Sequence, residues 1–163
     1  MSGVTGQTNW TDNIRLPGML HVTFLRSPYA HARITSVDVS AARNEPGVIA
    51  AYSGADFAAE QGSLPCAWPV TPDIVIPAHP PMAVDEVRYV GEAVAVVVAR
   101  DRYAAADAIE AIEIDYEPLP PVLDIRTALD EGAPKVHEAG NKSFEWTFAN
   151  GDLDAALDRK SVV

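Results

Sequence analysis

The chain has 163 residues, 48% of them hydrophobic, and a formal net charge of −11, which predicts one compact globular domain. Its acidity repels phosphate backbones, and the absence of a basic stripe argues against a nucleic-acid partner. No apolar run approaches the roughly 20 residues of a membrane span, no secretion signal opens the chain, and the single cysteine, Cys66, leaves no disulfide framework, so we expect a cytoplasmic protein without a membrane partner.

The first third of the chain contains three short stretches typical of strands. The apolar residues Leu20, Val22 and Phe24 alternate with a more polar series in the first of them. Ser40 follows the second stretch and is expected to cap a short helix, which Pro46 and Gly47 close. The predicted strands cover residues 20–25, 34–39 and 48–52, and the predicted helix covers residues 41–43.

The segment 64–81 interrupts this pattern with six of the thirteen prolines. Each proline fixes its own φ and removes a hydrogen-bond donor, so a regular central strand cannot pass through. We expect a long ordered surface arm, and two roles stay open for it. The arm either docks on a neighbour through Leu64, Trp68 and Ile76, or it folds back over its own sheet.

Regular structure returns after the arm with two more strands, at 87–90 and 93–99. The second strand has no polar residue on either face, which predicts burial on both sides. Asp101 is placed to cap a helix over 102–112. The next strand, 112–117, alternates cleanly, and Glu113 belongs to its polar face.

Three further elements are expected near the end of the chain. They are a short helix at 125–129, a strand at 144–148 and the start of a helix at 153–157. The whole pattern indicates an α/β (α+β) fold, with a β-rich mixed sheet, a few short helices and the proline-rich arm. We divide the chain into an N-terminal tail or cloning remnant (1–10), a domain (11–150) and a truncated start of a next segment (151–163).

The residue types that carry chemistry stand singly in this sequence. Cys66 lies in the arm without a nearby histidine, and no glycine-rich phosphate loop occurs. The acids near the end miss the spacing of a calcium loop, and helix-terminal acids explain them better. We therefore assign no catalytic, cofactor-binding or metal-binding residue. The positions considered are His21, His31, His79, His137, Asp152, Asp154 and Asp158.

Several ordered segments resemble one family. They read WTDNIRLPGMLH at 10–21, FLRSPYAHARI at 24–34 and VRYVGEAVAVV at 87–97, followed by IDYEPLP at 114–120 and GDLDAA at 151–156. These are similar to the opening of the large subunit in the xanthine dehydrogenase, aldehyde oxidase and aerobic carbon monoxide dehydrogenase family. The carbon monoxide dehydrogenase-like bacterial branch fits best.

The resemblance implies an α/β hammerhead fold and a larger parent enzyme. The complete large subunit would bind molybdenum–molybdopterin cytosine dinucleotide and oxidise aldehydes, N-heterocycles or carbon monoxide with water as the oxygen source. Its partners would be an iron–sulfur subunit and a flavin subunit that carries FAD. The family's cofactor-binding and catalytic motifs lie after the hammerhead and match no position here.

The motif between Arg26 and Ile34 also matches the family, and we assign it a structural role. Pro28 restricts Ser27, while Arg26 and His31 supply donors for carbonyls that a tight chain crossing would otherwise leave unpaired. Three hypotheses follow for the chain as a whole. It is a structural domain of a molybdenum hydroxylase that is inactive alone, a stand-alone interaction or assembly module, or a small independent enzyme.

Overall fold

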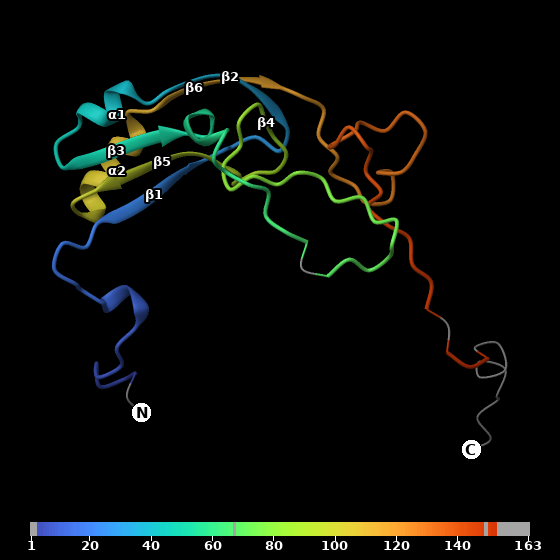
Figure 1. The fold of residues 1–163 in the computed structure, drawn as a ribbon, viewed down its shortest axis with the longest axis horizontal. Coiled ribbons are helices and arrows are strands. Elements are labelled where there is room, and N and C mark those ends of the chain that lie inside the picture. Colours follow the sequence, from blue (N-terminus) through green and yellow to red (C-terminus); the bar gives the residue numbers. More distant parts are fainter. Residues whose placement is uncertain (1–2, 67, 149, 153–163) are drawn as a thin grey trace. The chain divides into compact units, whose positions relative to one another are not determined.

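The computed structural model describes residues 3–66, 68–148 and 150–152. The chain divides into two compact units (Figure 1). Unit 1 consists of Met1–Leu64 and His79–Pro121, and unit 2 consists of Pro65–Ala78 and Val122–Val163. All the helices and strands found in the described residues lie in unit 1.

Unit 1 contains two three-stranded sheets. The first has the order β1-β5-β3 and the second the order β4-β2-β6, and every strand pair is antiparallel. The expectation of a mixed sheet was wrong in this respect. A parallel pair needs a crossover connection, and the one long helical connection, between β5 and β6, joins two different sheets. The strands are β1 (His21–Arg26), β2 (Ala32–Asp38), β3 (Val48–Ser53), β4 (Glu86–Val87), β5 (Ala93–Ala99) and β6 (Glu113–Pro118).

Two α-helices accompany the strands, α1 (Ser40–Asn44) and α2 (Arg102–Glu110), with short 3₁₀ turns η1 (Thr11–Asn13) and η2 (Ala55–Phe57). Asp101 caps α2 as predicted, because its carboxylate accepts from the N–H groups of Tyr103 and Ala104 at 2.9 and 3.0 Å. The cap predicted for Ser40 was wrong. Ser40 is the first residue of α1, and its own N–H donates to Asp38 at 2.8 Å.

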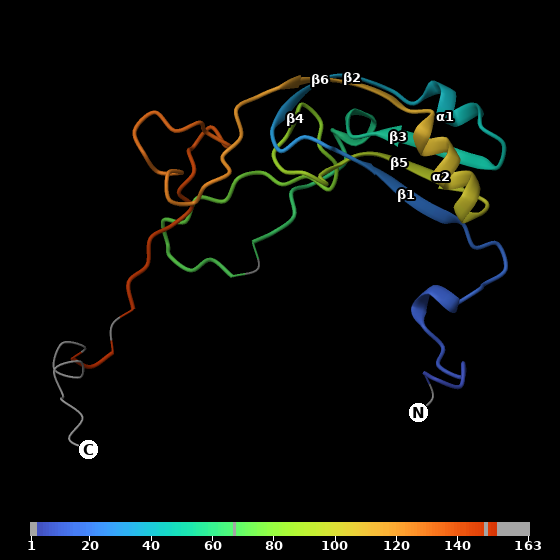
Figure 2. The ribbon, with the colours of Figure 1, turned by 180° about the vertical axis from the view of Figure 1, so that it is seen from behind.

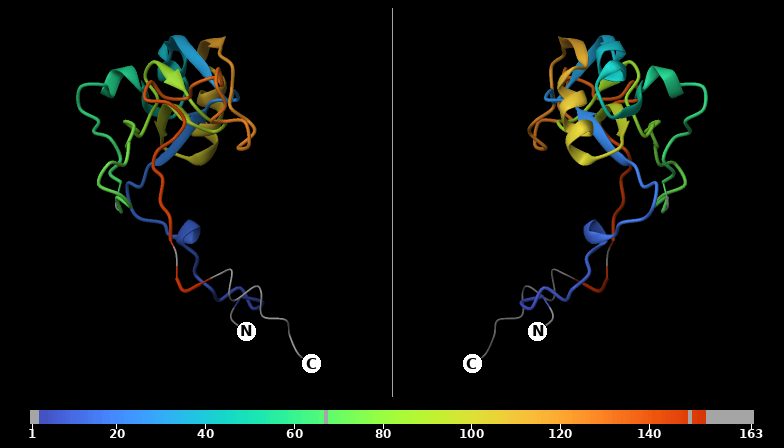
Figure 3. Two further views of the ribbon diagram at one scale, coloured as in Figure 1. Left: turned by 90° about the vertical axis from the view of Figure 1, so that its right-hand side faces the viewer. Right: turned by 90° about the vertical axis from the view of Figure 1, so that its left-hand side faces the viewer.

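The core of unit 1 is built around β5, the central strand of the first sheet. Ala95 and Val97 pack with Ala51 of β3 and with Ala42 and Ala108 of the two helices, and Figure 2 shows both helices beside this sheet. The small side chains let the helices approach closely. α2 also packs along β1 (Figure 3).

β5 is buried on both faces, as predicted, except that Val98 is half-buried. On its other side, Val94 joins Ala32 of β2 and Val87 of β4 in a second cluster. One strand therefore links the cores of both sheets. Glycine is required at position 54, where a Cβ atom would lie 2.0 Å from the carbonyl oxygen of Ala83.

The described residues of unit 2 form neither the helix at 125–129 nor the strand at 144–148 that the sequence predicts. Residues 125–129 form successive turns rather than a helix, because the Asp124 carboxylate accepts from the N–H of Arg126 at 2.9 Å and holds a local turn. Residues 144–148 form no strand. The helix expected at 153–157 lies outside the described residues.

The proline-rich arm is hydrogen-bonded to the chain that follows β6. The N–H of Val75 donates to the Ser143 carbonyl at 2.9 Å, and the Ser143 hydroxyl donates to the Val75 carbonyl at 2.8 Å. Most of the arm thus belongs to unit 2, a pairing that neither expected role included. Leu64, Trp68 and Ile76 are all at least half exposed, and docking through them stays a prediction.

Candidate functional site

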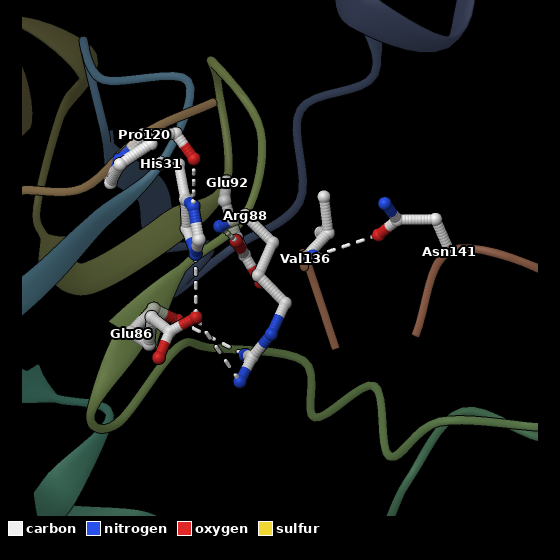
Figure 4. Close-up of polar contacts among 7 residues, drawn as sticks. All are labelled: His31, Glu86, Arg88, Glu92, Pro120, Val136 and Asn141. Atoms are coloured by element: carbon white, nitrogen blue, oxygen red, sulfur yellow. Dashed lines mark hydrogen bonds and ion pairs between the residues drawn. The ribbon is translucent and has the colours of Figure 1, made fainter. Parts of the chain in front are cut away.

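The most connected polar site in unit 1 surrounds His31, just before β2. Its Nδ1 lies 2.9 Å from the carbonyl oxygen of Pro120, and its Nε2 lies 2.7 Å from Oε1 of Glu86 (Figure 4). The backbone repeats the connection, since the N–H of Leu119 donates to the His31 carbonyl at 3.0 Å. His31 thereby joins the start of β2 to β4 and to the end of β6. We call this cluster the His31 crossing.

The hydrogen bonds fix the protonation of the imidazole. A carbonyl oxygen only accepts, so Nδ1 of His31 carries a proton and donates it to Pro120. The second contact joins Nε2 to the Glu86 carboxylate. His31 is 7% exposed. With both nitrogens engaged and the ring buried, no lone pair is left for catalysis or for a metal ion.

Arg88 completes the polar side of the crossing. Its guanidinium lies 3.7 Å from Oε1 of Glu86 and donates to the Glu86 carbonyl at 3.3 Å. Its backbone N–H donates to the buried carboxylate of Glu92 at 2.6 Å. Figure 4 shows Glu86, Arg88 and Glu92 near the His31 imidazole. Arg88 thus contacts both Glu86 and Glu92 within the domain, as expected for a cluster with a structural role.

The Ser27 segment is tied to the turn before β5 by a second set of bonds. Arg26 donates to the Gly91 carbonyl at 2.7 Å. The N–H of Ser27 donates to the Glu92 carbonyl, and the N–H of Gly91 donates to the Ser27 carbonyl, both at 2.8 Å. The predicted roles of Arg26 and His31, as donors to carbonyls at a tight crossing, are thus confirmed.

One buried hydroxyl at this crossing has no hydrogen-bond partner, that of Tyr116 in β6. Its ring packs on Tyr29, with the ring centroids 5.0 Å apart. Burial raises the pKa of Tyr116, and the nearby Ser27 hydroxyl offsets part of that rise. A neutral phenol with a raised pKa supplies neither a base nor a charge for catalysis.

The other positions considered from the sequence lie apart from the crossing. His21 is half-buried in β1, and the exposed His79 has its Nε2 3.5 Å from the Tyr89 hydroxyl. Cys66 is exposed in the arm, while His137 and Asp152 lie in unit 2. Asp154 and Asp158 lie outside the described residues.

Unit 2 holds a hollow of about 350 Å³, a volume within the range of small-ligand sites. Its walls are mainly apolar, with Val75, Val122 and Val136 among them. The Asn141 side chain in its lining is engaged locally, since it accepts from the N–H of Val136 at 2.9 Å (Figure 4). It also donates to the carbonyls of Ala128 and Pro134. The hollow therefore lacks the convergent free polar groups of a built ligand site.

Neither a cluster of metal-ligand side chains nor a membrane-spanning helix occurs in the described part of the chain. No group of three or more histidine, cysteine, aspartate or glutamate side chains there could hold a metal ion. No helix in the same residues is both long and apolar enough to cross a membrane.

Residues 5–120 match the family described as "Aldehyde oxidase and xanthine dehydrogenase, a/b hammerhead domain". The chain belongs to this family. The hammerhead is similar to the carbon monoxide dehydrogenase large chain of Afipia carboxidovorans, with 42% identity over 82% of this chain and 16% of that protein. It is 33% identical to the xanthine dehydrogenase molybdenum-binding subunit of Escherichia coli O157:H7, over 95% of this chain and 21% of that one.

A solved structure shows the same fold. Quinoline 2-oxidoreductase from Pseudomonas putida 86 superposes with a TM-score of 0.80 and 39% identity, over 88% of this chain and 18% of that chain. The expected hammerhead fold is therefore confirmed. This hammerhead spans less than a quarter of the length of each of these relatives.

The sequence analysis missed Glu86 and Glu92, which complete the crossing. Glu92 is 6% exposed and directly precedes the wholly apolar strand β5. A charged residue adjoining such a strand is a signal that its carboxylate is paired inside the domain. Glu86 offers no comparable signal, because its pairing with His31 joins positions 55 residues apart.

Proposed function

We propose that this hammerhead is a structural, non-catalytic domain of a molybdenum-dependent oxidoreductase large subunit. The observation that carries the proposal is the match of more than four-fifths of the chain to large subunits of such enzymes. The site geometry agrees with it. The buried imidazole of His31 is fully engaged in holding three segments together.

The described residues do not fit the molybdenum cofactor. The four buried polar residues of unit 1 have partners within the domain: Ser27 in its own turn, His31 and Glu92 in the crossing, and Ser53 at Asp56. None of them faces a cavity as an unpaired group. We assign the cofactor, as molybdenum–molybdopterin cytosine dinucleotide, to the remainder of the large subunit, and no step of the reaction to these residues.

The proposed activity of the complete enzyme is oxidation of an aldehyde, an N-heterocycle or carbon monoxide with water as the oxygen source. Electrons would leave through an iron–sulfur subunit and a flavin subunit. Relatives named for carbon monoxide, xanthine and quinoline all match this one domain, at 33–42% identity. We therefore place the choice of substrate outside the hammerhead.

The test is to express the complete reading frame that contains this sequence and to purify it with the subunits that accompany it. The proposal expects iron and flavin in the co-purifying subunits, and reduction of an artificial electron acceptor with a substrate from one of the three classes. Binding of the complete protein to other enzymes' assembly factors, with no such activity or cofactors, would instead support a stand-alone assembly module.

A further inference from the structure

Strand β1 turns its more apolar face away from the core. Side chains alternate between the two faces of a strand, and in β1 the residues at 21, 23 and 25 face the helices while Val22 and Phe24 face out. Val22 is 54% exposed and Phe24 is 43% exposed, and Leu20 just before the strand continues the exposed series. Burial of this apolar series would ordinarily set the register of the strand, so its exposure points to a missing cover.

The outward residues of the neighbouring strands extend this surface. Val22 lies opposite Val98 of β5, which in turn lies opposite Ala50 of β3. This row contains no polar side chain and lies on the sheet face opposite the helices. The next row across the sheet is Phe24, Val96 and Tyr52. We call these six residues, with Leu20, the open face.

The described residues of unit 1 cover part of the open face, where the rings of Phe57 and Tyr52 lie with their centroids 4.9 Å apart. Met82 and Phe57 pack on Val96, which leaves that residue 8% exposed. Phe24 and Tyr52 on either side stay exposed, with Arg26 and Arg43 over their rings at 5.9 Å each. Single exposed apolar residues are ordinary, but adjoining rows of them mark an interaction surface.

We propose that the open face is the surface on which the remainder of the large subunit packs. The inference rests on the proposed function, and it adds which face of the hammerhead is used. The relatives carry about four-fifths of their length outside the matched region. That remainder is the available occupant, and the segment that covers this face is apolar.

Two physical arguments favour the same polypeptide over other occupants. Permanent interfaces are the apolar ones, resembling a domain core cut in half, and a covalently linked segment covers such a face at high effective concentration as soon as both parts fold. A second copy of this chain is disfavoured because each copy carries a net charge of −11.

Hydroxyl-radical footprinting tests the proposal by comparing two tyrosines in one molecule. Tyr52 of the open face is 37% exposed, and Tyr103 on α2 is 76% exposed. In the 163-residue chain, the oxidation of Tyr52 relative to Tyr103 should be about one half, in proportion to exposure. In the complete large subunit without its partners, this ratio should fall about fivefold, because interface cores are packed as densely as protein interiors.

A double variant, Val22→Thr with Phe24→Thr, gives a second readout, since threonine keeps the preference for strand structure. The melting temperature of the 163-residue chain should stay within about 2 °C of wild type, as for other exposed positions. That of the complete subunit should fall by about 3 °C or more, while Tyr103→Thr changes neither protein.

Three results would overturn the proposal. They are an unchanged Tyr52 ratio in the complete subunit, protection that appears only when the iron–sulfur or flavin subunit is added, and protection of the 163-residue chain that grows with its concentration. An unprotected Tyr52 in a complete subunit that contains molybdenum would defeat this inference alone. A protected Tyr52 in a subunit without molybdenum would defeat the proposed enzyme function alone.

Discussion

The buried imidazole of His31 holds strand ends together that are far apart in the sequence. Pro120 and Glu86 approach it from two sides, and each offers a hydrogen-bond acceptor to the buried ring. The energetic weight of His31 therefore lies in what its removal would leave unpaired.

His31→Leu should lower the free energy of unfolding by about 2–4 kcal/mol, because the part-buried hydrogen bonds to the Pro120 carbonyl and the Glu86 carboxylate are both lost. Urea unfolding of the two proteins measures this difference. Glu117→Gln is the matched control, since it breaks an exposed ion pair with Arg33 and should cost less than about 1 kcal/mol. Equal midpoints for His31→Leu and wild type would contradict the structural role of the crossing.

Among single residues, the sequence predicted the hydrogen-bond donors of the crossing better than its acceptors. Arg26 and His31 stand in a recognisable motif with Pro28, so a tight crossing and its need for donors could be anticipated. Glu86 could not, because its role depends on β4 pairing with β2, which joins positions 55 residues apart. The cap prediction for Ser40 failed for a local reason, since Asp38 two residues earlier accepts from the Ser40 N–H and Ser40 lies inside the first turn of α1.

Among the elements, β5 is the one on which the fold most depends, because it contributes to every core cluster of unit 1. Val96→Asp should lower stability by several kcal/mol, comparable with the whole stability of a small domain. Glu113→Gln, on the exposed edge of β6, should be nearly silent. Thermal melts of both variants test the assignment, and two melts within a degree or two of wild type would show it to be wrong.

The cap of α2 gives the fold an acid-sensitive contact. Hydrogen bonds from the N–H groups of Ala104 and Tyr103 hold the pKa of Asp101 below its ordinary value of 3.8. A depressed folded-state pKa means that the cap stabilises the protein above that ordinary value, and that its contribution is lost as the pH falls through the lowered pKa.

Asp101→Ala should therefore lower the melting temperature at pH 7, and the gap to wild type should narrow as the pH falls below 3.8. Asp107→Ala on the same helix is the control, because Asp107 is exposed and caps nothing; its melting temperature should hold or rise. A difference in melting temperature between Asp101→Ala and wild type that stays constant down to pH 2 would contradict the capping role of Asp101.

The predicted elements succeeded where periodicity and burial agree. β5 has the continuous apolar run of a strand buried on both faces, and α2 has both a cap and a narrow apolar face. Prediction failed after Pro121, where short apolar stretches lack a partner within reach. Residues 125–129 instead follow the turn set by Asp124, and residues 144–148 form no strand.

For the whole molecule, the arm links two distant parts of the sequence, because Val75 pairs with Ser143. Its prolines pre-set an extended backbone, which lowers the entropy cost of docking, and Trp68 is 81% exposed. Limited proteolysis of the 163-residue chain should cut early between Gln61 and Ala83, and the remaining subunits should protect that segment. Resistance in the isolated chain would mean that the arm is no docking element.

We propose a structural role for this chain and assign the molybdenum cofactor to the remainder of the large subunit. The hammerhead limits of 11–150 stay a prediction, and so does the lack of a cofactor in this part. We expect no cofactor in this part because its buried His31, Ser53 and Glu92 side chains are engaged in hydrogen bonds within the domain.

The most direct test is the molybdenum content of two well-washed proteins, measured by inductively coupled plasma mass spectrometry. We expect no bound molybdenum in the 163-residue chain and close to one molybdenum atom per chain in the complete large subunit. Near-stoichiometric molybdenum in the 163-residue chain, or none in a folded complete subunit produced with a functioning cofactor supply, would contradict it.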